Sequence, residues 1–278
     1  MKSSLLPSIN PLTETKQIIE FIQESLTKAN FSRIVIAISG GIDSATSLYL
    51  ATKSIRPQNV FPIMLPYSNL SKESIKYAET LLKKSLIPSE NIELIDITKP
   101  VEDIKSTLKL ASPKEPAFSI RTGNIMARLR MIALFDRAKK HNALVLGTEN
   151  KSEHLLGYFT RFGDSASDIE PIQHLYKSQI YQLAQFLDVP HSIIIRAPTA
   201  GLWERQTDEG EFGFTYELAD QILYGSFNLK LTPAQLVARG FKKRDIQKIL
   251  SRVSSNAFKH YLPFVYPSYA GLSRFNRD

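Results

Sequence analysis

Hydrophobic and polar positions along the chain alternate between the period of a helix and the period of a strand. Apolar residues at helical spacing predict helices over 14–30, from Ser44 onward and over 71–86. Short apolar runs between and after them predict strands at RIVIAIS (33–39), NVFPIML (59–65), NIELIDI (91–97), ALVLG (143–147) and DIEPI (168–172).

Strands that alternate with helices of this length predict a specific fold class. Successive βαβ units have right-handed crossovers and build a parallel sheet. We therefore expect an α/β fold with a doubly wound, mostly parallel sheet and helices on both of its faces.

The pattern weakens after residue 200 into short helices, within 213–225, 231–240 and 241–258. In LTPAQ, Thr232 is placed as an N-cap and Pro233 stands in the first turn. We expect one domain over 1–278, with an α/β nucleotide-binding core at 14–200 and a small helical C-terminal elaboration at 201–278.

The stretch AISGGIDSA follows the first predicted strand, where parallel α/β sheets bind ligands. Gly40 and Gly41 allow positive φ and a close backbone approach, while Ser39 and Ser44 add hydroxyl donors at the start of a helix. These features suit phosphate oxygens, although the lysine of an ordinary P-loop is absent. Asp43 would repel a bare phosphate, which predicts a hard cation such as Mg²⁺ between them. A glycine-rich turn with a buried aspartate cap is the alternative.

Composition narrows the possible functions. The 278 residues are 43% hydrophobic and 22% charged, with no apolar run of membrane-spanning or signal-peptide length, so we expect a cytoplasmic protein without membrane association. The chain has no cysteine, which excludes disulfides, thiolate metal sites and a cysteine nucleophile. A net charge of +8 favours anionic partners such as nucleotides or nucleic acid.

The stretch SGGIDS resembles the SGGxDS signature of N-type ATP pyrophosphatases, which share the adenine nucleotide α-hydrolase-like fold and cleave ATP between its α- and β-phosphates. In that superfamily the loop holds the departing pyrophosphate, so a lysine that follows the γ-phosphate is not required. The signature alone leaves open GMP, asparagine and argininosuccinate synthetases, tRNA-modifying enzymes and NAD synthetase.

Several later segments are similar to NAD synthetase, in the family's order and spacing from about 14 to 263: RTGNIMARLRM, LVLGTENKSEHLLGYFTRFGD, DIEPIQHLYKSQIYQLA and PTAGLWERQTDEGEFGFTYE. The resemblance implies an ATP-dependent amidation of deamido-NAD with ammonia through an adenylate. The products would be NAD, AMP and pyrophosphate, with ATP as co-substrate and Mg²⁺ as cofactor.

The resemblance also implies an ATP site and a metal site. Asp43 and Glu153 match Mg²⁺ ligands, whereas each alone could be a surface or capping acid. Thr148 and Thr199 match ATP contacts, and Lys177 matches a phosphate-binding lysine that would otherwise be interpreted as a solvated helix residue. The full set expected at ATP is Ser39, Gly40, Gly41, Asp43, Ser44, Thr148, Lys177 and Thr199.

Four residues match deamido-NAD contacts: Arg128, Arg161, Asp168 and Lys259. Arg161 stands where the family often has lysine, and of the family's C-terminal basic segment only Lys259 is retained. In the helix that carries Arg128, the apolar residues Ile125, Leu129, Ile132 and Ala133 are expected to face the core, leaving Arg128 free for a ligand. Arg121 and Arg130 are plausible substitutes.

Asp164 is the expected catalytic residue, as a carboxylate that attracts ammonium and accepts its proton. A plain turn aspartate is the alternative. The family usually has glycine after this aspartate, where the chain has Ser165 and Ala166, so the loop backbone is expected to differ.

The missing cysteine predicts use of free ammonia, or of ammonia from a separate subunit, and the resemblance implies a homodimer with deamido-NAD at the interface. A tRNA-modifying or GMP-forming pyrophosphatase is the first alternative, although no nucleic-acid module is evident and nucleic acid is an unlikely partner. A non-catalytic ATP-binding regulator is the second alternative. Retention of Asp43, Glu153, Lys177 and Asp164 together argues against it.

Overall fold

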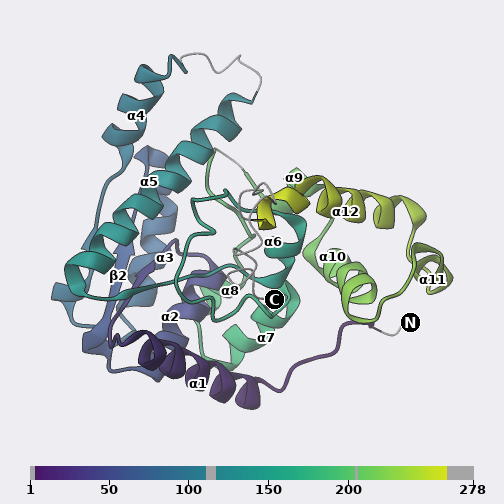
Figure 1. The fold of residues 1–278 in the computed structure, drawn as a ribbon, viewed down its shortest axis with the longest axis horizontal. Helices are drawn as coiled ribbons and strands as arrows, with labels where there is room; N and C mark the ends of the chain where they lie inside the picture. Colours follow the sequence, from purple (N-terminus) through teal and green to yellow (C-terminus); the bar gives the residue numbers. More distant parts are fainter. Residues whose placement is uncertain (1–3, 111–116, 204–205, 262–278) are drawn as a thin grey trace, which may run out of the picture.

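The computed structural model describes residues 4–110, 117–203 and 206–261. Its sheet has four parallel strands in the order β3-β2-β1-β4 (Figure 1). The strands are β1 (Ile34–Ala37), β2 (Val60–Met64), β3 (Glu93–Leu94) and β4 (Leu144–Leu146). Because β4 lies on the opposite side of β1 from β2, the strand order reverses beside β1, as in a doubly wound sheet.

The predicted strand over 168–172 is wrong in its extent. Only one bridge forms there, between Leu146 and Ile169. Pro171 has no N–H to donate to a ladder, and the side chain of Asp168 accepts a hydrogen bond from the Val145 N–H at 2.8 Å.

Helices cover both faces of the sheet, which confirms the predicted layers. Ile34 and Ile36 of β1 face one apolar cluster, and Val35, between them, faces another. The first cluster is covered by α1 (Pro11–Ala29), α2 (Ile42–Ser54), α3 (Lys72–Leu82), α7 (Lys177–Phe186) and α8 (His191–Ile194). The second is covered by α4 (Thr98–Thr107) and α5 (Phe118–His141), which stand together in Figure 1.

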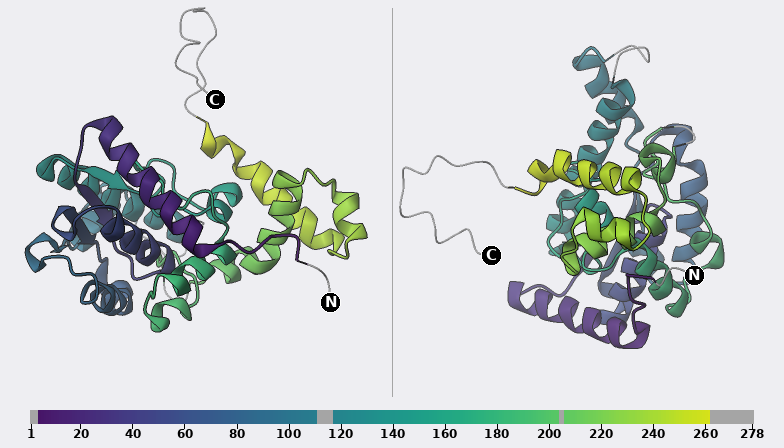
Figure 2. Two further views of the ribbon diagram at one scale, coloured as in Figure 1. Left: turned by 90° about the horizontal axis from the view of Figure 1, so that it is seen from below. Right: turned by 90° about the vertical axis from the view of Figure 1, so that its right-hand side faces the viewer.

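The C-terminal helices pack around a third apolar cluster, on the side of the molecule away from α4 (Figures 1 and 2). The helices of this C-terminal unit are α9 (Asp208–Phe212), α10 (Tyr216–Leu223), α11 (Pro233–Ala238) and α12 (Lys243–Asn256), and α6 (Lys151–Leu156) joins them. Thr232 caps α11 in a capping box with Gln235, as predicted for the cap. The backbone N–H groups of Leu5 and Leu6 donate to Gln221 Oε1, so the start of the chain contacts this unit too. The division of the domain at residue 200 stays a prediction.

Short single-turn elements complete the described chain. They are the 3₁₀ helices η1 (Pro57–Asn59), η2 (Ser68–Ser71), η3 (Ser89–Asn91) and η5 (Ala257–His260), and a π-helical turn, η4 (Tyr224–Asn228). No helix within 4–110, 117–203 and 206–261 is both long and apolar enough to cross a membrane.

The expected core face of α5 is partly wrong. Ile132 is 57% exposed, whereas Met126, Leu134 and Ala138 are buried against the sheet. Apolar residues occur on two sides of this helix, so the periodicity alone did not identify the side that packs. Arg128 is exposed, as expected.

Glu93 joins the outer strand β3 to the end of α5. Partial burial alone would raise its pKa, but hydrogen bonds from Arg137, Lys140 and His141 outweigh burial and lower the pKa of Glu93 to about 2. Because folding lowers this pKa from its ordinary 4.5, the contacts stabilise the protein above pH 4.5, and this stabilisation is lost as the pH falls toward 2. We expect Glu93→Gln to lower Tm at neutral pH and to flatten the fall of Tm in acid, measured by thermal unfolding from about pH 7 to about pH 3. Equal acid dependence in parent and variant would contradict this.

Candidate active site

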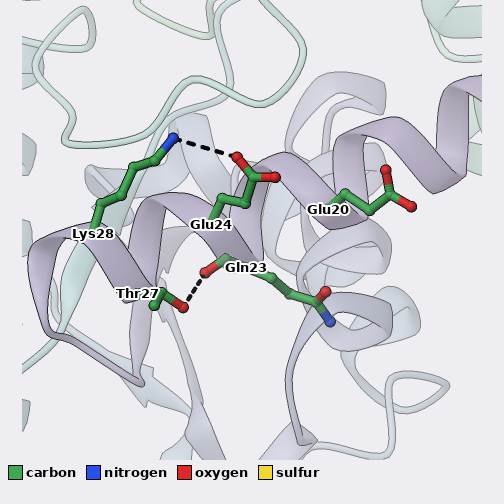
Figure 3. A pocket seen from close by; sticks show the side chains of 5 residues that line it. All are labelled: Glu20, Gln23, Glu24, Thr27 and Lys28. Carbon is green, nitrogen blue, oxygen red and sulfur yellow. Dashed lines mark hydrogen bonds and ion pairs between the residues drawn. The ribbon is translucent and has the colours of Figure 1, made fainter.

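A cavity of about 470 Å³ opens at the carboxyl ends of β1 and β4, where the strand order reverses. Its walls come from the loop after β1, from Gly147 and Thr148 after β4, and from the segments 157–164 and 196–203. Ligands of doubly wound folds bind at this position. A second hollow lies on the outer face of α1, where exposed polar side chains of one helix surround it (Figure 3). It is a solvated helix face without converging groups.

The SGGIDS loop has the geometry expected of a phosphate site. Gly40 has φ +76°, and a Cβ there would lie 2.5 Å from the Ser74 carbonyl oxygen, so this position requires glycine. Gly41 has an ordinary φ of −89° and is the N-cap of α2, which begins two residues earlier than predicted. The hydroxyls of Ser39 and Ser44 are 3.0 Å apart and line the cavity beside the helix N-terminus.

Two carboxylates converge on the buried ammonium of Lys177. Its Nζ lies 2.5 Å from Asp43 Oδ2 and 3.2 Å from Glu153 Oε1, and its side chain is 2% exposed. Burial would lower the pKa of Lys177, but the charges of Asp43 and Glu153 outweigh it and raise that pKa, so Lys177 is a cation. Asp43 and Glu153 therefore both point at one position, where their negative charges stabilise a cation.

Glu153 is held by a capping box at the start of α6. The Asn150 side chain accepts a hydrogen bond from the Glu153 N–H at 3.0 Å, and Glu153 Oε2 accepts one from the Asn150 N–H at 3.3 Å. Asn150 is fully buried and donates through Nδ2 to Asp43 Oδ1 at 2.9 Å. One amide thus fixes both carboxylates. In the sequence NKSE, Asn150 and Glu153 have the three-residue spacing of a capping box, but the sequence prediction did not use this signal.

Burial raises the pKa of Glu153 to about 8, with the charge of Lys177 opposing this shift and the charge of Asp43 adding to it. A carboxylate that resists ionisation beside another carboxylate gains from an added cation. Two carboxylates in a cavity that can also hold phosphate oxygens would give Mg²⁺ the oxygen ligands that it prefers. Among the residues described, no three Asp, Glu or His side chains gather closely enough to hold a metal ion by themselves. A metal here would need phosphate oxygens to complete its ligands.

Asp164 lines the same cavity on a loop after α6. Its Oδ1 accepts a hydrogen bond from the Thr160 N–H at 2.8 Å, and Ser165 Oγ donates to the Thr160 carbonyl at 3.1 Å. Ser165 therefore closes the loop with a hydrogen bond to the backbone of Thr160. The Asp164 side chain is open to the cavity but enclosed by protein beyond it, and this desolvation raises its pKa despite the opposing backbone hydrogen bonds. A carboxylate with a raised pKa is a stronger proton acceptor.

A family model described as NAD synthase matches residues 14–263. The chain belongs to the NAD synthase family.

Relatives of this NAD synthase family member cover nearly its whole length. An NH₃-dependent NAD(+) synthetase from Fusobacterium nucleatum is 41% identical over 249 residues, which span 90% of this chain and 93% of that protein. One from Wolinella succinogenes is 39% identical over 254 residues, 91% of this chain and 95% of that protein. An NMN synthetase structure from Francisella tularensis has a TM-score of 0.80 at 30% identity, covering 94% of this chain and 100% of that one. The NH₃-dependent NAD synthetase structure from Campylobacter jejuni has a TM-score of 0.75 at 29% identity, covering 93% and 100%.

The cavity of this NAD synthase family member brings together most residues predicted at ATP, both predicted metal ligands and the predicted catalytic residue. They are Ser39, Gly41, Asp43, Ser44, Thr148, Glu153, Asp164, Lys177 and Thr199. Gly40 belongs to the loop but does not line the cavity.

The residues predicted at deamido-NAD are not gathered in this way. Arg128, Arg161 and Asp168 lie outside the cavity lining. Arg128 donates to the Arg161 carbonyl at 3.2 Å, and Arg161 donates to the Tyr261 carbonyl at 2.5 Å. Lys259 does line the cavity, but its Nζ donates to the carbonyls of Gly157 at 2.6 Å and Phe159 at 2.9 Å, so in this state it ties down the loop that leads to Asp164. The substrate roles of these four residues stay predictions.

Two further cavity residues were missed by the sequence prediction. Asp208 is 3% exposed and accepts hydrogen bonds from the hydroxyls of Tyr158 and Tyr216, each at 3.1 Å. Arg196 donates to the Gly40 carbonyl at 3.3 Å and stacks over the ring of Tyr77. Asp208 lies in the acidic run DEGE, which has the composition of a solvated surface, and Arg196 has no motif around it. Only the tertiary fold brings them to the site.

Proposed function

We propose that this chain uses ATP to amidate the nicotinate carboxylate of deamido-NAD with ammonia, giving NAD, AMP and pyrophosphate. The proposal rests on one observation. The SGGIDS loop, the ion cluster formed by Lys177 with Asp43 and Glu153, and Asp164 all line the same cavity. The curated relatives named NH₃-dependent NAD(+) synthetase support the choice of substrates.

In the first half-reaction, the nicotinate carboxylate attacks the α-phosphorus of ATP and pyrophosphate leaves. The SGGIDS loop and the first turn of α2 would bind the departing phosphates through backbone N–H groups and the hydroxyls of Ser39 and Ser44. Asp43 and Glu153 would hold Mg²⁺, which when bound neutralises phosphate charge. Lys177 would move its ammonium from the two carboxylates to a phosphate oxygen, supplying the cation that the loop lacks. The adenylate makes a good leaving group of an otherwise unreactive carboxylate oxygen.

In the second half-reaction, ammonia attacks the acyl carbon and AMP leaves. Ammonium is the dominant form at neutral pH and must lose a proton before it can attack. Asp164 would attract the cation electrostatically and then accept its proton, a task favoured by its raised pKa.

A mononucleotide acceptor is the second candidate, because the Francisella tularensis structure with a TM-score of 0.80 is that of an NMN synthetase. Nicotinate mononucleotide presents the same carboxylate without the second nucleotide half. The positions of Arg128, Arg161 and Asp168 outside the cavity agree with a substrate that does not reach them.

The test is to incubate purified protein with ATP, Mg²⁺ and ammonium, and with either deamido-NAD or nicotinate mononucleotide. Amide product, AMP and pyrophosphate should form in equal amounts. A higher kcat/KM with deamido-NAD supports the first proposal, and a higher value with the mononucleotide supports the second. Absence of both products, with ATP left intact, would contradict both. Glutamine should not replace ammonium, because a cysteine nucleophile for its hydrolysis is absent from the sequence.

We also propose that the chain forms a homodimer through the exposed side of α5. Ile132 is 57% exposed and Phe135 36% exposed, and Arg128 lies on the same side of the helix. Apolar residues exposed together on one helix face favour a protein contact.

Because ATP is a cytoplasmic metabolite, we place the reaction in the cytoplasm.

The dimer predicts a specific effect of substitution in α5. We expect Ile132→Asp to shift the protein from dimer to monomer in sedimentation velocity, because an unpaired charge is then buried in the contact. Thermal unfolding should stay cooperative with only a modest fall in Tm, since Ile132 is more than half exposed in the monomer and the fall reflects mainly the lost dimer contact. Leu12→Asp, at a similarly exposed position (53%) near the start of α1 and outside the cavity lining, is the matched comparison and should stay dimeric. A monomeric parent protein at micromolar concentration would refute the proposal.

A further inference from the structure

The first turn of α7 is held by side chains from two other helices. Lys177 and Ser178 begin this helix, so their N–H groups have no acceptor within it. The Lys177 N–H donates to Ser152 Oγ at 2.9 Å, and the Ser178 N–H donates to Asp220 Oδ2 at 2.8 Å. Both acceptors come from distant parts of the sequence.

Asp220 stands at the centre of this arrangement. It is fully buried and belongs to α10 in the C-terminal unit, which packs against both α6 and α7 (Figure 1). Its Oδ1 accepts from Ser152 Oγ at 2.5 Å, and its Oδ2 accepts from Ser178 Oγ at 2.6 Å as well as from the Ser178 N–H. One carboxylate therefore ties α6 to the start of α7.

The residues that Asp220 fixes are sequence neighbours of the ion cluster. Ser152 precedes Glu153 on α6, and Ser178 follows Lys177 on α7. The side chains of Glu153 and Lys177 meet at 3.2 Å, and Lys177 is only 2% exposed. A shift of α6 against α7 would change this distance directly, because Glu153 and Lys177 are each the immediate neighbour of a serine that Asp220 holds.

A carboxylate suits this position better than a neutral side chain. Three donors need acceptors, and asparagine has a single acceptor oxygen whereas ionised aspartate has two. The negative charge also faces the positive end of α7. The contacts of Asp220 with α6 and α7 therefore account for an aspartate at this position. Asp220 itself lies outside the cavity lining.

We propose that Asp220 is a positioning residue for the ATP half of the reaction. It holds Ser152 and Ser178 so that Glu153 and Lys177 are aligned for the phosphates and their metal ion. The C-terminal unit, through α10, thereby helps to align phosphate-binding groups that lie on α6 and α7. The identity of the ligand, ATP with Mg²⁺, rests on the proposed function.

The test compares Asp220→Asn and Ser152→Ala with the parent. Both should weaken binding of MgATP by about tenfold, measured by isothermal titration calorimetry, and raise the KM for ATP by a similar factor. The KM for ammonium should stay unchanged, because the Asp164 loop is not part of this network. Ser178→Ala, which leaves the Ser152 link and the Ser178 N–H bond intact, should have a smaller effect.

A matched control separates alignment from loss of stability. Ser54 is a buried serine whose hydroxyl bonds within its own helix, to the Leu50 carbonyl at 2.7 Å, so Ser54→Ala should lower Tm without changing MgATP affinity. If Asp220→Asn does not fold, Ser152→Ala decides the question. MgATP binding equal to the parent in Ser152→Ala would overturn the proposal. If the parent binds MgATP but forms no amide, the proposed function fails while this binding comparison still holds.

Discussion

Replacing Asp43 by asparagine should lower kcat by roughly a thousandfold, because a metal ion bound by carboxylates supplies several kcal/mol of charge stabilisation to the transition state. Asp43 is one of only two carboxylates that contact Lys177 among the interactions described. Asparagine keeps an oxygen that can accept from Asn150 but loses the charge that attracts a cation. The measurement is the initial rate of amide formation over a wide range of Mg²⁺ concentrations. Excess Mg²⁺ should recover part of the loss, as expected for a weakened ligand.

Glu24→Gln is the control for the Asp43 variant. Glu24 lies on the outer face of α1, where Figure 3 shows it paired with Lys28, and both side chains are well exposed. Exposed pairs of this kind contribute little, so its activity and Tm should match the parent. A folded Asp43→Asn protein that keeps the parent rate and the parent Mg²⁺ dependence would contradict the assignment of the carboxylate pair. Thermal unfolding without ligands establishes that the variant is folded.

The part of the site that could be predicted from sequence is local in the chain. The SGGIDS loop contains its own glycine with positive φ, its own hydroxyls and the helix that follows, so short-range pattern was enough. Thr232 as a helix cap was predictable for the same reason, since a cap depends on neighbours three residues away. The alternation of strands and helices gave the layers, because crossover handedness and burial leave few arrangements.

The parts that could not be predicted depend on contacts between distant residues. Asp220 and Ser152 are 68 residues apart, and no periodicity marks either as a partner of the other. Helix α5 has apolar residues on two sides, and the side that carries Met126 is the one that packs against the sheet. The strand expected at 168–172 shortened to one bridge because Asp168 uses its side chain, rather than only its backbone, to bond beside β4. These outcomes are decided by tertiary structure.

Replacing Asp164 by asparagine should lower kcat/KM for ammonium by about 10²–10⁴-fold, the range of a lost general base. The amide cannot accept the proton and does not attract the cation, although it keeps an oxygen for the Thr160 N–H. The first half-reaction should still proceed. Pyrophosphate should therefore form in a single turnover with ATP and deamido-NAD and no ammonia. The measurement is the rate of NAD formation against ammonium concentration, together with this single-turnover release of pyrophosphate.

The pH profile adds a sharper distinction for the same variant. If Asp164 removes the proton within the cavity, as proposed, the parent rate should depend only weakly on pH once the carboxylate is ionised. In Asp164→Asn, the nucleophile must arrive as free ammonia, and kcat/KM for total ammonium should rise about tenfold per pH unit below the ammonium pKa. Asp103→Asn, an exposed aspartate on α4 paired with Lys99, should retain the parent profile. Loss of pyrophosphate release together with NAD formation would instead place Asp164 in the ATP half, since a residue needed only for ammonia cannot affect a step that precedes it.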